Sequence, residues 1–279
     1  MRTILCLTLC AVLCGTTAFG QLDRTKVFRD TRIVNAHSVE LIPKGTMKFI
    51  ISHRFGALNT GIQELYGLDR AEIRLGLDYA PFNNVNIGFG RSSQEKHYDF
   101  YLKYRLLQQR KDGNSPISLV YYTNAAVRTI QAPETEGLSL SQKLTYVHQV
   151  LAGRRFNDWL SLQLMPTLVH RNFVFDPTSN NDIYSLGAAG RFQLSKIVAV
   201  NLEYFYRLPD QLENPEVRNP IGLGIELETK GHIFQLNFTN SIAMIAPEYI
   251  AETTGNIFEG DIHFGFNITR DFKIGHREY

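Results

Sequence analysis

The sequence has no cysteine beyond residue 14 and no long apolar run beyond its first 20 residues. All 3 cysteines, Cys6, Cys10 and Cys14, fall within a short N-terminal leader. The rest of the chain therefore offers no thiol nucleophile, no cysteine-based metal site and no disulfide framework. No apolar segment after the leader approaches the roughly 18 residues that a membrane-spanning helix needs. If this chain crosses a membrane, it has to cross as strands.

The chain also lacks an excess of charge of one sign. It has 29 Lys and Arg residues against 27 Asp and Glu residues, for a formal net charge of +2. A partner such as nucleic acid would demand basic residues gathered on one face, so nucleic acid is not expected as a partner. No linker-like stretch interrupts the composition, and one large domain is the simpler expectation.

The first 20 residues have the pattern of a secretory signal peptide. Arg2 supplies the positive start, Ile4 to Leu13 supply a short apolar run, and small residues precede a cleavage site after Gly20. A lipoprotein anchored at Cys14 is the alternative, but the bulky Leu13 just before it disfavours that choice. We expect this signal peptide to direct the protein to the envelope of a Gram-negative bacterium and to be removed on export.

Segments with a period of two residues dominate what remains. In Ala71 to Tyr79 every odd position is apolar and every even position is charged or glycine, which is typical of a strand with one greasy and one polar face. About a dozen such segments occur, and the pattern predicts an all-β fold over residues 46–279: a transmembrane antiparallel up-and-down β-barrel of about 12 strands. The expected strands span residues 47–55, 71–79, 85–90, 98–106, 117–128, 140–151, 159–171, 183–194, 197–208, 221–229, 232–240 and 261–270.

The connections between these segments alternate in length. Short links such as Ser195-Lys196 and Lys230-Gly231 alternate with longer ones such as residues 56–70 and 241–260. A membrane barrel has short turns on its periplasmic rim and long loops on its outer rim. The alternation therefore predicts that both chain ends lie on the periplasmic side.

The polar face of the strands carries charges of both signs, which we expect to line the lumen. The expected lumen-lining residues are Arg54, Glu72, Arg74, Asp78, Asp99, Lys103, Arg105, Arg128, Arg191, Glu203, Arg207, Glu226 and Glu228. Opposite charges on neighbouring strands can bond across the interior, so a filled or very narrow lumen is favoured over a wide channel. The polar segment 21–45 either folds into the lumen as a plug or stays in the periplasm; the sequence leaves both open.

Catalytic and cofactor sites find little support. No Gly-x-Ser-x-Gly elbow occurs, and His148 and His170, which share the outward register on neighbouring strands, have no serine beside them. The 8 histidines show no close ligand spacing, so neither a transition-metal site nor another cofactor is expected. Oxygen-bearing residues alternate from Asp176 to Asp182 as in a calcium loop, but Asn181 and Gly187 break that motif.

Two stretches carry a resemblance to a known family. The run from Thr31 to Glu40, followed by Pro43-Lys44-Gly45 and by Ser52 to Gly56, resembles the start of an uncharacterised family of outer-membrane β-barrel proteins, mainly from Bacteroidota, known as a domain of unknown function. Residues 65–69 and 73–77 resemble it as well. The resemblance implies a barrel and an outer-membrane address, and it implies nothing about a substrate.

Two classes of function follow from this pattern. The first is a narrow channel for small polar solutes, lined by mixed charges, and the second is a closed structural or docking barrel without transport. A soluble lipocalin-like binder is disfavoured because its apolar residues would point inward around a ligand. Expected partners are outer-membrane lipid and the barrel-assembly machinery, which favours aromatic ends such as Tyr279, with an unknown periplasmic or extracellular protein as a further candidate.

Overall fold

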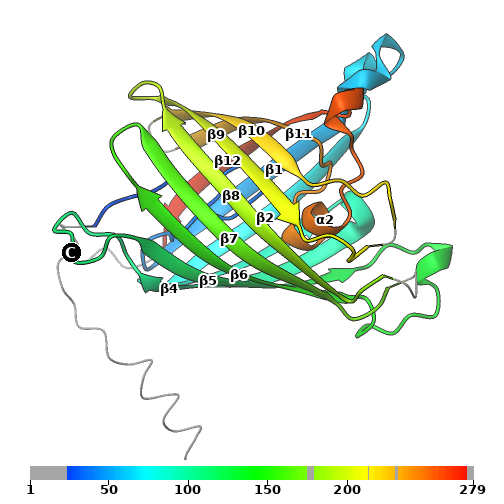
Figure 1. Cartoon of the computed structure of the whole chain (residues 1–279), viewed down its shortest axis with the longest axis horizontal. Coiled ribbons are helices and arrows are strands. Elements are labelled where there is room, and N and C mark those ends of the chain that lie inside the picture. The colour runs from blue at the N-terminus through cyan, green and yellow to red at the C-terminus, as the bar shows by residue number, and fades with distance from the viewer. Residues whose placement is uncertain (1–23, 175–178, 213, 230–231, 275–279) are drawn as a thin grey trace, which may run out of the picture.

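Twelve antiparallel strands close into one barrel. The computed structural model describes residues 24–174, 179–212, 214–229 and 232–274, so the expected signal peptide lies outside the described residues. Each strand pairs with its neighbours in the sequence, and β1 pairs with β12 to complete the circle (Figure 1). This confirms the up-and-down barrel and its strand number. The strands are β1 (Thr46–Ala57), β2 (Ala71–Phe82), β3 (Val85–Ser92), β4 (His97–Leu107), β5 (Ser118–Arg128), β6 (Leu144–Arg155), β7 (Leu160–Arg171), β8 (Asp182–Gln193), β9 (Val198–Arg207), β10 (Ile221–Thr229), β11 (His232–Thr239) and β12 (His263–Lys273).

Side chains alternate between the two faces of the wall as the sequence pattern requires. On β2, Leu75 and Leu77 are 46% and 44% exposed, whereas Arg74, which precedes Leu75, is 1% exposed. The apolar face therefore points away from the barrel axis, toward lipid. The outward arginines Arg154 and Arg270 lie near strand ends, over the rings of Phe156 and Phe272.

The links divide between two rims. The short-turn rim has links as short as Asn83-Asn84 and holds the start of β1 and the end of β12. The long-loop rim holds the other links, which contain η2 (Leu58–Thr60), η3 (Ile62–Gly67), η4 (Gln94–Lys96), η5 (Pro133–Thr135), α2 (Ala246–Ala251) and η6 (Ile257–Glu259). No helix among the described residues is long and apolar enough to cross a membrane.

Two strand starts differ by more than one residue from the sequence-based expectation. Strand β6 begins at Leu144 and not at residue 140, because the amide of Ser139 donates to the side chain of Gln142 and so forms a turn. Strand β12 begins at His263 and not at Asp261. The Asp261 carboxylate accepts hydrogen bonds from the Asn59 side chain (2.6 Å) and the Asn256 amide (2.8 Å), which hold it in the preceding loop.

Candidate functional site

The expected lumen residues occupy inward positions on the wall, and many are buried. Their exposures include 0% for Arg54 and Lys103, 4% for Glu203 and 2% for Glu226, whereas Glu72, Arg105, Arg128, Arg207 and Glu228 near the rims are more open. Two ion pairs each reach across one intervening strand, from β2 to β4 and from β8 to β10. Arg74 contacts Asp99 with both Nε (2.9 Å) and Nη2 (2.6 Å), and Arg191 Nη2 lies 2.8 Å from Glu226. Side chains so shielded from water do not line an open, water-filled pore in this conformation.

The N-terminal segment fills the lumen from the short-turn rim. Residues 24–45 enter beside the β4–β5 link, where the Thr25 amide donates to the Gln109 carbonyl, and return to the start of β1. Between these ends, residues 31–38 form a hairpin, in which the Ile33 amide donates to the Ala36 carbonyl and the Ser38 amide to the Thr31 carbonyl. We call residues 24–45 the plug, residues 31–38 the plug hairpin, and the remaining residues of the plug its stem. All eight residues of the hairpin are buried.

Glu203 on β9 holds the tip of the plug hairpin. Its carboxylate accepts hydrogen bonds from the amides of Val34 (3.1 Å), Asn35 (2.8 Å) and Ala36 (3.0 Å). These three backbone amides are not paired with any strand, and one carboxylate accepts from all of them. Such charge-assisted hydrogen bonds are stronger than neutral ones. On the other side of the tip, Asn267 donates to the Val34 carbonyl at 2.9 Å.

The stem of the plug and the base of the plug hairpin are also bound mainly through polar contacts. Asp30 pairs with Lys48 on β1 and accepts from the Thr269 hydroxyl at 2.8 Å. Burial works to raise the pKa of Asp30, but the Lys48 ammonium outweighs it and holds that pKa below its usual value. On β7, Gln163 accepts from the Val39 amide and donates to the His37 carbonyl, both at 2.8 Å.

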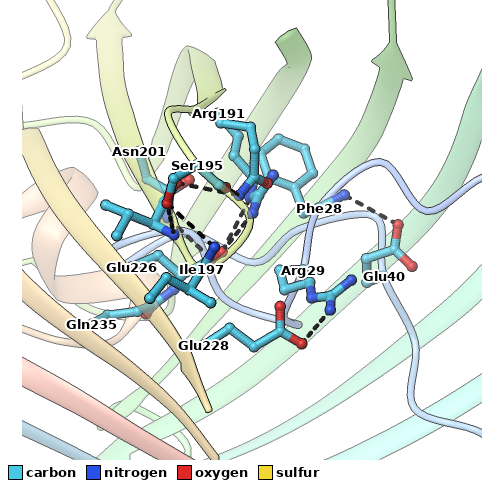
Figure 2. A network of polar contacts seen from close by, with 12 residues as sticks. Phe28, Arg29, Glu40, Arg191, Ser195, Ile197, Asn201, Glu226, Glu228 and Gln235 are labelled. Carbon is cyan, nitrogen blue, oxygen red and sulfur yellow. Dashed lines mark hydrogen bonds and ion pairs between the residues drawn. The ribbon is translucent and has the colours of Figure 1, made fainter. Parts of the chain in front are cut away.

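Figure 2 shows where the plug stem meets the wall near the short-turn rim. Arg29 of the plug pairs with Glu228 on β10, and the Phe28 amide donates to Glu40 within the plug at 3.3 Å. Glu226 on β10 accepts hydrogen bonds from Asn201 on the neighbouring strand β9 and from Arg191 on β8, one strand further away. Several of the wall charges expected from the sequence therefore act in holding the plug or each other.

A second segment enters the lumen from the long-loop rim. It is the part of the β11–β12 loop around α2, and all six residues of α2 are buried. Glu248 of α2 lies 2.8 Å from Nδ1 of His97, Glu252 just after the helix lies 2.5 Å from Nη2 of Arg128, and Arg207 donates to the Ile250 carbonyl at 3.3 Å. Figure 1 shows α2 at that end of the barrel.

Apolar side chains of the plug, α2 and the wall pack into one cluster inside the barrel. The plug contributes residues such as Ile33 and Val39, α2 contributes Tyr249 and Ile250, and the wall contributes residues such as Phe205. The Phe205 and Tyr249 rings lie 5.4 Å apart. The middle of the barrel is therefore filled by protein, and cavities lie toward its ends. One of about 400 Å³ adjoins the plug stem, Lys48 and Glu228; one of about 310 Å³ adjoins α2 and Arg128.

Sequence reasoning left two features of this site open or missed them. The sequence leaves the placement of the plug open, although Asn35, a residue type that favours turns, is a weak signal for a hairpin. The sequence predicts a solvated outer loop over residues 241–260, whereas α2 within that loop is buried. The loop's apolar run Ile242-Ala243-Met244-Ile245-Ala246 is the signal that was available, since so apolar a run is unusual in a solvated loop.

The two outward histidines lie at polar contacts on the barrel's exterior. His148 Nδ1 lies 2.7 Å from the Tyr121 hydroxyl, and His170 Nδ1 lies 2.5 Å from Asp182. His148 also lies 3.2 Å from the Thr123 hydroxyl, so the contacts of the two histidines are with Tyr, Thr and Asp side chains. Within the described part of the chain, no group of three or more His, Cys, Asp or Glu side chains is arranged to hold a metal ion. Asp176, the first residue of the incomplete calcium motif, lies outside that part.

Comparisons with solved structures find porins and an outer-membrane channel that resemble this chain in fold. The NanC porin matches with a TM-score of 0.52 at 7% identity, covering 81% of this chain and 99% of that one. The KdgM porin matches with a TM-score of 0.46 at 11% identity, covering 81% and 99%. An outer-membrane channel from Pseudomonas putida F1 matches with a TM-score of 0.48 at 13% identity, covering 84% and 98%. At these identities the likeness concerns the fold alone.

A comparison with curated proteins finds no match. A family model described as "Membrane bound beta barrel domain (DUF5777)" matches residues 28–272, which include the plug hairpin and nearly all of the barrel. The closed barrel and its lipid-facing apolar exterior agree with this description of a membrane-bound barrel. The chain belongs to the family of membrane-bound β-barrel domains of unknown function, DUF5777.

Proposed function

We propose that the protein is a gated channel for small polar solutes, closed in this conformation by its own plug. The observation that carries the proposal is how the plug is held. Its hairpin adds no strand to the barrel, and Glu203 alone binds three of its backbone amides. A segment held in this way can leave without disturbing any pair of wall strands.

The chemistry of the wall favours a lumen that tolerates water once the plug is gone. The plug's partners Lys48, Gln163, Glu203 and Asn267 are charged or amide side chains, which water would solvate. Exchanging a protein hydrogen bond for a water hydrogen bond costs only about 0.5–1.5 kcal/mol net. Each polar contact therefore adds only a small amount to the free energy of opening, and the apolar packing of the plug adds to that sum.

The same proposal sets the cellular place of the protein. Its fold and family favour the outer membrane of a Gram-negative bacterium, reached after cleavage of residues 1–20, with the short-turn rim and the plug on the periplasmic side. Transport, and not catalysis, is the activity that the plugged, charge-lined lumen supports. A periplasmic protein that pulls on the plug is the partner this arrangement would suit.

Single-channel conductance in a planar lipid bilayer tests the gate. We expect the wild-type protein to be closed for most of the time and the Glu203→Ala variant to open frequently. The reason is that the substitution leaves three buried amides without an acceptor, at a cost of about 1–3 kcal/mol for each unsatisfied group. Glu203→Gln keeps one acceptor oxygen and should fall between the two.

Glu72→Gln is the matched control. Glu72 also points inward, but its contacts are with Ser93 and Arg70 near the long-loop rim, away from the plug. It should behave as the wild type. If neither wild type nor Glu203→Ala conducts, although both are folded, the gated channel is wrong.

A closed docking barrel is the second candidate, and one observation favours it. The apolar cluster that joins the plug, α2 and the wall resembles the core of a domain, and burying such side chains stabilises the closed form at roughly 25 cal/mol per Å². In that case the plug would be permanent, and the two rims would serve as contact surfaces. Absence of current in all variants is the outcome that would favour it.

A further inference from the structure

A groove lies on the outer face of the wall, over strands β6 to β9, which are side by side in Figure 1. Its volume is about 680 Å³, within the roughly 300–1,000 Å³ that is usual for ligand pockets. Ala188 and Gly190 on β8 form its floor. Leu162 on β7 and Leu202 on β9 pair with Gly190 from its two sides. Because neighbouring strands lie about 4.7–4.9 Å apart, these larger side chains stand roughly 10 Å from each other across the floor.

The groove runs from the short-turn rim toward the middle of the wall. Strand β8 ends at Gln193 on that rim, so Gly190 lies nearer to the rim than Ala188 does. Phe156 and Trp159 in the adjacent β6–β7 link are 53% and 55% exposed. Exposed aromatic rings at the ends of a membrane barrel mark the level of the lipid headgroups. One end of the groove is therefore at headgroup depth, and the rest is at the depth of the acyl chains.

Arg154 on β6 lines the headgroup end of the groove. It is exposed, and its guanidinium lies 5.1 Å from the centre of the Phe156 ring. The carboxylate nearest in sequence, Asp158, is bound by Arg155 at 3.0 Å, and none of the ion pairs among the described residues includes Arg154. Lys196, in the turn that follows β8, is a second exposed cation on this rim. The rim beside the groove therefore carries positive charge, which attracts anionic lipid headgroups.

We propose that the groove binds an acyl chain of one anionic phospholipid, with the headgroup phosphate at Arg154. The walls of the groove are apolar and face the bilayer, so a hydrocarbon chain matches them, and a guanidinium can bind a phosphate through two parallel hydrogen bonds. A second copy of the chain is a poorer match. A symmetric dimer brings the same surface of both subunits together, so it would place Arg154 and Lys196 of both copies in one interface.

Native mass spectrometry of the protein in detergent micelles tests this site, because it counts the lipids bound to each barrel. The probes are dioleoyl phosphatidylglycerol, which is anionic, and dioleoyl phosphatidylcholine, whose choline neutralises its own phosphate. We expect one phosphatidylglycerol per barrel to bind about tenfold more tightly than phosphatidylcholine, a ratio that corresponds to about 1.4 kcal/mol. Glycerol 3-phosphate, which has the phosphate but no acyl chain, should not bind.

Arg154→Gln tests the headgroup contact. It should weaken phosphatidylglycerol binding about tenfold and leave phosphatidylcholine binding unchanged, because only the charge is lost. Arg270→Gln is the matched control. Arg270 is also exposed near the short-turn rim and lies 5.2 Å from the Phe272 ring, but it does not line the groove. Its variant should bind both lipids as the wild type does.

Ala188→Leu tests the acyl-chain contact by filling the floor of the groove. It should weaken the binding of both lipids about tenfold, and Ala152→Leu, on the β6 side of the groove, should act in the same direction. Both positions face lipid, where leucine is tolerated. Ala125→Leu is the control, since Ala125 pairs with the outward Phe100 on the same barrel but lies outside the groove.

The outcomes are decisive for the site. Equal affinity of the wild type for the two lipids, an equal loss in Arg270→Gln, or unchanged binding in both Ala188→Leu and Ala152→Leu would overturn it. A dimer that forms without bound lipid and is lost in Ala188→Leu would assign the groove to a second copy instead. None of these measurements depends on whether the Glu203→Ala variant conducts, so the lipid site and the proposed channel can fail separately.

Discussion

Arginines inside the barrel differ in what they contact, although the sequence pattern treats them alike. Arg74 makes a bidentate ion pair with Asp99, and both side chains are almost fully buried. Arg105 lies on the same strand as Asp99, β4, but nearer to the short-turn rim, and its side chain donates a long hydrogen bond to the Asn83 carbonyl at 3.4 Å. The alternation identifies both as inward-facing, but it carries no information about the partner of either.

This difference sets their expected effects on stability. Arg74→Met should lower the free energy of unfolding by about 3–5 kcal/mol, because it leaves Asp99 buried without its cation. Arg105→Met should change that free energy by less than about 1 kcal/mol. Urea unfolding in micelles, followed by tryptophan fluorescence, measures both. Equal losses in the two variants would contradict the assignment.

At the scale of elements, the plug hairpin shows what strand patterning cannot supply. The Asn35 amide and Glu203 lie 168 positions apart, and Val39 and Gln163 lie 124 positions apart. No local pattern in residues 21–45 predicts partners so far away in the sequence. The sequence therefore permitted either a plug or a periplasmic segment, and the contacts with β7, β9 and β12 place residues 24–45 inside the barrel.

The hairpin's buried histidine makes the plug sensitive to acid. His37 lies between the rings of Tyr101 and Tyr122, at 4.5 and 4.3 Å, and neither of its ring nitrogens has a hydrogen-bond partner. Burial, and after it the nearby cations, lower the pKa of His37 well below its ordinary 6.5. The nearby cations are Arg32, Lys103 and Arg74. In the plugged form His37 is therefore neutral.

Acid should consequently loosen the plug. A released hairpin has a histidine with an ordinary pKa and takes up a proton below pH 6.5, so the closed form is favoured above that pH and loses stability as the pH falls below it. Hydrogen–deuterium exchange in residues 31–38, corrected for intrinsic rates, should be about tenfold faster at pH 5.5 than above pH 7. His37→Phe should remove this dependence; an unchanged dependence would show that another group is responsible.

At the scale of the whole molecule, the pairing of β1 with β12 leaves no free strand edge in the wall. The exterior is a continuous band of side chains such as Leu75, Phe100 and Leu164, each about half exposed. In water such a band would drive association, whereas in a bilayer it is solvated by lipid. Closure and the apolar exterior together make the barrel an integral membrane body.

Washing membranes with alkaline carbonate checks this conclusion. The protein should stay with the membrane pellet, because neither high pH nor salt removes a barrel held by its apolar band. A peripheral protein of the same membranes serves as the control and should be released. Appearance of the folded chain in the supernatant would contradict an integral barrel.

The sequence by itself determined the wall. Strand number, sidedness and the alternation of short turns with long loops all follow from a period of two residues, which is a local property because successive side chains point to opposite faces. Only the tertiary structure decided what fills the barrel that this wall encloses. The positions of the plug and of the α2 segment depend on contacts between residues far apart in the chain. Glu203 contacts Asn35, and Glu248 contacts His97, only because closure of the barrel brings these residues together, and no local sequence pattern encodes either contact.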